Sequence, residues 1–170
     1  LTKPLGTGVL ATALKRRQLD PVGLQALTAR LTELNRIGSI LGTVDSVHAM
    51  TDVTGFGLLG HLWEMCAGSG CSAELEWDAI PIIEGASDLL AKGVYADGGM
   101  RNWRSVHAHV EGANTMERMI LAADPQTNGG LLIAIDPSAV EDVQRMIERT
   151  GTMAKRIGML AQGPPGIRIH

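Results

Sequence analysis

The segment "MTDVTGFGLLGH", residues 50–61, places one carboxylate, two hydroxyl groups and two glycines directly ahead of an apolar, helix-like run. Glycine lets a ligand approach the backbone closely, and the first turn of a helix presents unpaired N–H groups with partial positive charge. The stretch "TGFG" leading into a helix therefore suits a phosphate group. Asp52, just before it, suits Mg²⁺, which takes one or two carboxylates and completes its shell with phosphate and water.

A second interpretation of the same residues stays open. Asp52 or Thr54 can act as the N-cap of the following helix, and Gly57 and Gly60 can serve tight packing. Taken alone, this motif favours the structural interpretation. The rest of the sequence has to decide between a binding site and a capped helix.

Two further loops carry groups that suit a ligand. In "ADPQTNGGLL" a turn begins at Asp124 and Pro125, and Gly129 and Gly130 permit unusual backbone angles before a strand. The polar side chains between them stand where a ligand could reach them: Gln126, Thr127 and Asn128. In "DGGMRN", Arg101 follows two glycines and can meet phosphate or carboxylate in a forked geometry. An exposed loop arginine is the alternative.

The opening segment "LTKPLGTG" places Lys3 ahead of a glycine-bearing helix start, as phosphate sites often do, but it lacks the Gly-Lys-[Ser/Thr] of a P-loop. No Ser-His-Asp or Cys-His arrangement can be argued, so we expect no catalytic residue in this chain. Cys66 and Cys71 lack the spacing of a zinc knuckle, and we expect both to be reduced. His61 is expected to be an internal hydrogen-bonding group.

Composition bounds the classes of protein that remain. The 170 residues are 45% apolar and 19% charged, which predicts one globular domain over residues 1–170. A net charge of −3 without a basic stripe argues against nucleic acid. No apolar run has the length of a membrane span and no signal-peptide pattern opens the chain. These features predict a cytoplasmic protein with no membrane partner.

The segments between these loops are predicted to be helices and strands, which are interleaved along the chain. Helices are expected at residues 5–17, 21–38 with Asp20 as N-cap, 56–70, 84–93 and 136–151. Strands are expected at residues 44–50, 71–77, 130–135, 153–160 and 166–170. Residues 95–105 are expected to form a loop, and Met116 and Met119 to fill the core. The interleaved order predicts an α+β or layered α/β/α domain.

The four loops form a set that is more specific than any one of them. In order, "LTKPLGTGVL", "TDVTGFGLLGHL", "GGMRN" and "ADPQTNGGLLIAI" closely resemble successive motifs of selenophosphate synthetase, also called selenide, water dikinase. "AKRIG" resembles the closing pattern of that family. The resemblance runs from the first residue to nearly the last and covers the family's C-terminal domain. It implies the fold of the aminoimidazole ribonucleotide synthetase superfamily, a layered α/β/α domain with a mixed sheet of about four strands.

The resemblance also implies an activity. The family makes selenophosphate from ATP, selenide and water, releases AMP and phosphate, and requires Mg²⁺. It implies that this chain is the C-terminal domain of a longer, homodimeric enzyme. The partner within that enzyme would be its own N-terminal domain, which holds most of the ATP site, several metal-binding aspartates and the reactive Cys or selenocysteine. The fragment alone is then expected to be inactive.

Residue by residue, Asp52 matches the aspartate that the C-terminal domain contributes to the metals. The residues expected to contact the nucleotide lie in the same motifs: Lys3, Thr51, Thr54, Gly55, Gly57, Arg101, Asn102, Thr127, Gly129 and Gly130. Asn128 departs from the family pattern, where Ser is more common, so the polar contacts of its loop stay open. Two alternatives remain: a related ATP-dependent kinase or ligase with another substrate, or a non-catalytic assembly domain.

Overall fold

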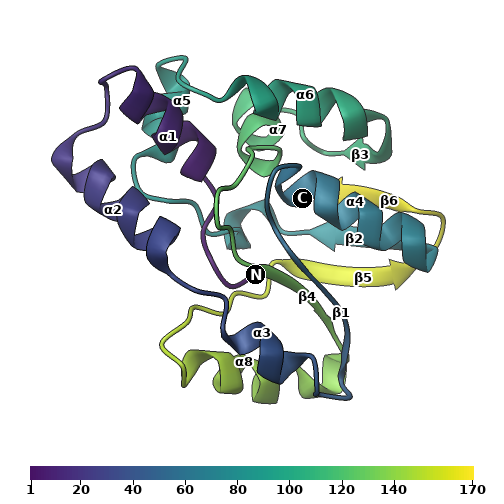
Figure 1. Cartoon of the computed structure of the whole chain (residues 1–170). Coiled ribbons are helices and arrows are strands. Elements are labelled where there is room, and N and C mark those ends of the chain that lie inside the picture. Colours follow the sequence, from purple (N-terminus) through teal and green to yellow (C-terminus); the bar gives the residue numbers. More distant parts are fainter.

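The computed structural model describes all residues, 1–170, and combines eight α-helices with six strands (Figure 1). The helices are α1 (Thr7–Lys15), α2 (Pro21–Thr32), α3 (Ile37–Leu41), α4 (Gly57–Ser69), α5 (Ala86–Ala91), α6 (Asp97–Val106), α7 (Met116–Ala122) and α8 (Val140–Glu148). The strands are β1 (Val47–Asp52), β2 (Cys71–Leu75), β3 (Val110–Glu111), β4 (Leu131–Ile135), β5 (Gly158–Gln162) and β6 (Gly166–Ile169). The predicted α+β class with a mixed sheet of four strands is confirmed.

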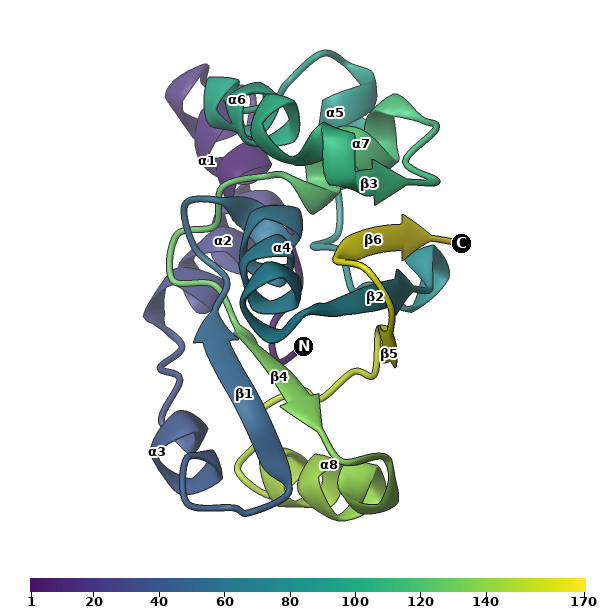
Figure 2. The same ribbon diagram turned by 90° about the vertical axis from the view of Figure 1, so that its right-hand side faces the viewer.

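The larger sheet has the strand order β3-β6-β2-β5. Strand β5 runs antiparallel to β2, whereas β6 runs parallel to both β2 and β3. Helix α4 lies against this sheet (Figure 2). Its buried residues Leu58, Leu59 and Leu62 join Leu75 and Ile167 in the largest hydrophobic core. This packing holds α4, and therefore the loop in front of it, at a fixed place on the sheet.

The smaller sheet pairs β1 with β4 in antiparallel register, and its last pair is Asp52 with Leu131. The end of β1 therefore lies beside the start of β4. Helices α3 and α8 share a separate apolar cluster with this pair, in which Leu41, Leu131 and Val143 are buried. The register places the loop that follows β1 next to the loop that precedes β4.

The N-terminus of α2 forms as the local sequence predicts. Asp20 caps it by accepting the N–H of Gly23 at 2.7 Å, and Pro21 is the first helical residue. The predicted end at Gly38 is wrong, because α2 ends at Thr32 and a separate helix, α3, follows. The Asn128 side chain donates to the carbonyl oxygens of Leu31 and Glu33 at 2.9 and 2.8 Å. A residue almost 100 positions away thus completes the C-terminus of α2.

The expected loop at residues 95–105 is also wrong, since these residues lie almost entirely in α6. Gly98 and Gly99 disfavour a helix by propensity. Here, however, Gly98 lets α6 approach the loop before β4, since a Cβ added to Gly98 would lie 3.1 Å from Pro125 Cγ. A Cβ added to Gly99 would make only ordinary contacts, the nearest at 3.7 Å from Ile120 O. Tertiary packing therefore compensates for the low helical propensity.

Helix α7 was not expected. Met119 packs against the core as predicted, whereas Met116 is 53% exposed, so the core role predicted for it is wrong. Judged by length and apolar character together, none of the helices qualifies as a membrane span.

Candidate functional site

Two loops that are distant in sequence pack directly on each other at the end of the β1–β4 pair (Figure 2). The backbone N–H of Gln126 donates to Thr54 O at 2.9 Å, and that of Val53 donates to Gly130 O at 2.8 Å. Gly57 has φ +71°, and a Cβ added there would lie 2.6 Å from the Ala123 carbonyl carbon. The loop after β1 and the loop before β4 therefore form one backbone-packed unit.

Two glycines of the loop before β4 are needed for the same close approach. A Cβ added to Gly129 would collide with Val53 O, and one added to Gly130 would collide with the backbone nitrogen of Lys3. Packing thus explains these glycines. Contact between them and a nucleotide stays a prediction.

Asp124 and Gln126 bind the N-terminus of α1. The Oδ2 atom of Asp124 accepts the N–H of Gly8 at 2.9 Å, and Oε1 of Gln126 accepts the N–H groups of Gly6 and Thr7 at 3.1 and 3.2 Å. Both side chains are buried. The expectation that Gln126 reaches a ligand is therefore wrong, because its polar atoms are used inside the protein.

Asp124 is a functional candidate that sequence reasoning missed, since nothing near it in sequence indicates a buried carboxylate. Burial raises its pKa to about 7, against the opposing effect of the hydrogen bonds from Gln126, Gly8 and Val9. Its Oδ1 atom is buried without a hydrogen-bond partner. A buried polar atom without a partner is energetically costly, and protonation of the carboxyl reduces that cost.

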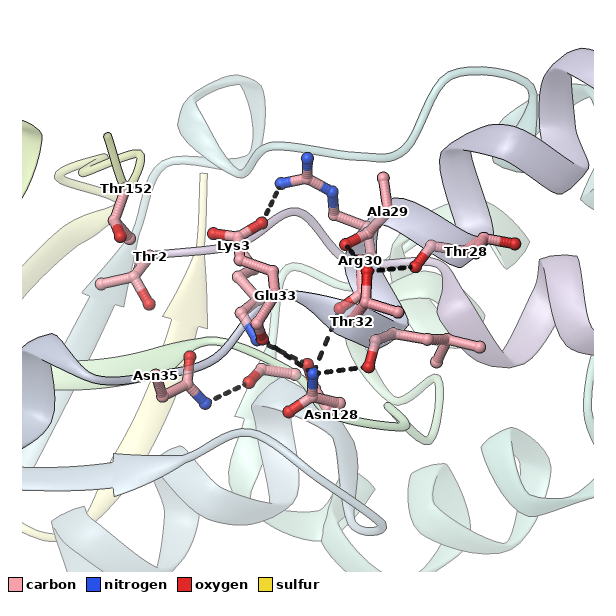
Figure 3. A network of polar contacts seen from close by, with 12 residues as sticks. Thr2, Lys3, Thr28, Ala29, Arg30, Thr32, Glu33, Asn35, Asn128 and Thr152 are labelled. Atoms are coloured by element: carbon pink, nitrogen blue, oxygen red, sulfur yellow. Dashed lines mark hydrogen bonds and ion pairs between the residues drawn. The ribbon is translucent and has the colours of Figure 1, made fainter. Parts of the chain in front are cut away.

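Lys3 lies in a polar network with Asn128 at the C-terminal end of α2 (Figure 3). Its side chain is only 1% exposed, and Nζ donates to Glu33 O at 2.7 Å and to Asn128 O at 2.9 Å. Burial lowers the pKa of Lys3, and the charge of Glu33 opposes that shift. The ammonium group therefore holds α2 on the loop before β4, and its predicted contact with phosphate stays untested.

The backbone conformation of Asn128 and its contacts suit asparagine at this position. It has φ +52°, a left-handed conformation that asparagine tolerates better than most residues. Its side chain reaches the end of α2, and Asn35 from the other side donates to Gly129 O at 2.8 Å (Figure 3). The side-chain contacts of Asn128 are therefore contacts within the protein.

Asp52 remains exposed at the end of β1, with Thr51 and Thr54 half-buried beside it. Helix α4 begins at Gly57 without a hydrogen bond from any capping side chain. Asp52 and Thr54 are therefore not its N-cap, which removes the capping alternative for both residues. Thr54 Oγ1 instead lies 3.3 Å from Nε2 of the buried His61, which confirms His61 as an internal hydrogen-bonding group.

Helix α6 reaches the same loops. The Asn102 side chain donates to Gly55 O at 2.8 Å and to Ala123 O at 3.0 Å, and Arg101 beside it is exposed. Thr127 is exposed as well, with its N–H bound to Thr7 Oγ1 at 2.9 Å. The four motif segments thus converge at one end of the β1–β4 pair, although residues in contact are up to 129 positions apart.

The chemistry available here is that of a ligand-binding surface. No three His, Cys, Asp or Glu side chains come together in the arrangement of a metal cluster. One exposed carboxylate next to an uncapped helix start fits Mg²⁺ that is bound mainly by phosphates and water.

Cys66 and Cys71 are free. Burial and the nearby Cys71 thiol raise the pKa of Cys66 to about 12. A raised thiol pKa opposes nucleophilic reactivity.

Comparison with known proteins places these motifs in a family. Residues 1–169 match the model described as AIR synthase related protein, C-terminal domain. The chain is 44% identical over 160 residues to a selenide, water dikinase of Haemophilus influenzae (strain 86-028NP), covering 94% of this chain and 46% of the relative. It is 43% identical over 173 residues to that of Cronobacter sakazakii (strain ATCC BAA-894), covering 100% and 50%.

A solved structure shares the fold. The hydrogenase maturation protein HypE in complex with ATP superposes with a TM-score of 0.64 at 14% identity, covering 98% of this chain and 45% of HypE. The chain spans about half the length of the curated relatives it matches. Because the family model covers nearly every residue, this chain belongs to the AIR synthase related proteins, as their C-terminal domain.

Proposed function

We propose that residues 1–170 form the C-terminal domain of a selenide, water dikinase, which converts ATP, selenide and water into selenophosphate, AMP and phosphate. The observation that carries the proposal is the convergence of the four motif segments around the exposed Asp52. Relatives with that name match nearly the whole chain at 43–44% identity. The likeness to HypE with bound ATP supports ATP as the nucleotide.

Phosphoryl transfer depends on positioning and charge neutralisation more than on covalent chemistry by the protein. In this proposal the Asp52 carboxylate holds Mg²⁺, which neutralises phosphate charge when bound. The exposed backbone of Gly55, in the loop directly before α4, receives a phosphate. No atom lies within 4 Å of a Cβ added to Gly55, so a ligand has room to approach the backbone there.

The motif residues divide by exposure into two groups. The accessible ones are proposed to contact nucleotide or metal: Thr51, Asp52, Thr54, Gly55, Arg101 and Thr127. The buried ones, together with the half-buried Asn102, are proposed to shape and hold the loops of the site: Lys3, Gly57, Asn102, Gly129 and Gly130. The structural contacts of the second group support this division.

The remaining parts of the site are proposed to come from an N-terminal domain of the same enzyme, with ATP and Mg²⁺ shared between the two domains. A homodimer of the full-length enzyme belongs to the same proposal. We also propose a cytoplasmic location, because Cys66 and Cys71 are free and structural disulfides are rare in that compartment.

The test is an assay of the full-length enzyme with ATP, Mg²⁺ and selenide, in which phosphorus-containing products are identified by ³¹P NMR. We expect AMP, phosphate and selenophosphate, all three dependent on selenide. A parallel reaction without selenide measures background hydrolysis. ATP turnover that is indifferent to selenide, with no selenophosphate formed, would assign the chain to a related kinase or ligase instead.

A further inference from the structure

The side-chain amide of Asn102 bridges the loop after β1 and the segment before β4, in addition to the backbone contacts between them. Its Nδ2 atom donates to Gly55 O at 2.8 Å and to Ala123 O at 3.0 Å. A carboxamide nitrogen carries two hydrogens, so these two carbonyl groups use its whole donor capacity. Asn102 itself comes from α6, so a third element is hydrogen-bonded to both loops.

The two carbonyl groups differ in how firmly their segments are held. Ala123 is fully buried and packs against Gly57, where any side chain would collide. Gly55 is exposed, with open space where its Cβ would be. Asn102 therefore ties the freer part of the loop to a rigid part of the core.

The position of the loop matters because of the groups it carries. Asp52 ends the strand before it, Thr54 lies within it, and α4 begins at its end. The Thr54 carbonyl oxygen accepts the N–H groups of Gly57 and Gln126 at 3.0 and 2.9 Å. A shift of Gly55 would move this carbonyl and change the distance between the Asp52 carboxylate and the start of α4.

We propose that Asn102 is a positioning residue, which sets the spacing between the Asp52 carboxylate and the N-terminus of α4 for a nucleotide–Mg²⁺ ligand. Its action on the ligand is indirect, through the Gly55 carbonyl. The ligand in this statement rests on the proposed function, whereas the positioning of the loop is a property of this chain alone. The two parts can therefore fail separately.

Two variants remove the bridge in different ways. Asn102→Asp replaces the donor with a carboxylate oxygen that faces two carbonyl oxygens, which repels both segments. Asn102→Ala removes the donors without adding charge and is the gentler change. Asn114→Asp is the matched control, because Asn114 is exposed, lies outside the motifs and undergoes the same change of charge.

The first measurement is amide hydrogen exchange by NMR on this chain without ligand. The amides of Gly57 and Gln126 report directly, since both donate to Thr54 O. We expect them to exchange about tenfold faster in both Asn102 variants, the change that follows from losing one or two hydrogen bonds. The Val53 amide, which donates to Gly130 O, and all amides of Asn114→Asp should keep wild-type rates.

The second measurement compares the full-length enzymes over a Mg²⁺ titration. We expect Asn102→Ala to raise the Mg²⁺ concentration for half-maximal turnover, with recovery of kcat at high Mg²⁺.

Unchanged hydrogen exchange at the Gly57 and Gln126 amides in both variants would overturn the positioning role. If ATP affinity were weakened at the same time, Asn102 would be a direct ligand contact. Faster exchange in a protein without selenide-dependent turnover would keep the positioning role and reject the proposed function.

Discussion

The carboxylate of Asp124 lies at the N-terminus of α1 and accepts the N–H of Gly8 at 2.9 Å, with no exposed surface of its own. A Cβ on Gly8 would collide with the same carboxylate, so the two residues require each other. This contact anchors the segment that carries Gln126 and Thr127 to α1. It also leaves a buried titratable group in the scaffold of the site.

Asp124 should make stability depend on pH in the direction opposite to most aspartates. Its pKa is about 7 in the folded protein, above its ordinary value of 3.8. The folded state therefore retains a proton that the unfolded state releases, so the contribution of Asp124 to stability is present below about pH 4 and is lost as pH rises towards 7. The expected loss is a few kcal/mol.

Urea unfolding at several pH values between 4 and 8 measures this effect. Asp124→Asn should remove the decline, whereas Asp142→Asn on the exposed surface of α8 should keep it. The prediction concerns the difference between variants in how the free energy of unfolding changes with pH, because the other titratable groups contribute equally to each variant. Parallel stability curves for wild type and Asp124→Asn would contradict the prediction.

Asp52→Asn in the full-length enzyme should abolish or nearly abolish turnover. The substitution removes the charge that Mg²⁺ requires from its few protein ligands. Stability should change by less than about 1 kcal/mol, because Asp52 is exposed and caps no helix. Turnover over a Mg²⁺ titration and the melting temperature check both parts. Asp45→Asn, at an exposed position just before β1, is the matched control. Wild-type turnover of Asp52→Asn at low Mg²⁺ would end the metal assignment.

Two glycines of the site should respond in opposite ways to the same substitution. Gly129→Ala places a methyl group against Val53 O and should destabilise the chain by about 1–3 kcal/mol. Gly55→Ala meets no atom within 4 Å and should leave stability nearly unchanged while reducing ATP-dependent turnover of the full-length enzyme. Thermal unfolding and turnover of both variants test the pair. Normal turnover in a stable Gly55→Ala enzyme would exclude close approach of a phosphate at Gly55.

This chain by itself should form no AMP from ATP, Mg²⁺ and selenide. It brings no cluster of metal-binding side chains, and its more deeply buried cysteine has a raised thiol pKa. Chromatographic detection of AMP against an enzyme-free blank is sufficient. Adding the proposed N-terminal domain as a separate chain is the informative companion reaction, and steady AMP formation without it would refute the expectation.

Sequence alone determined the features that depend on neighbours along the chain. Asp20 and Pro21 start α2 because a side chain three residues away satisfies a free N–H. Gly70 ends α4 in a left-handed conformation that glycine adopts readily. The motif order likewise predicted the family, because it is a property of the sequence itself.

Tertiary structure decided what depends on residues far apart. Helix α2 ends at Thr32, where Asn128 binds its last carbonyl groups, and α6 forms despite two glycines, with Pro125 packed closely against Gly98. The same holds for the site. Gln126 has a side chain suited to a ligand, but its Oε1 atom accepts N–H groups at the N-terminus of α1. Asp52, in contrast, stays exposed. A polar side chain binds a ligand only if no nearer group of the protein satisfies it first, and only the packed chain brings those groups together.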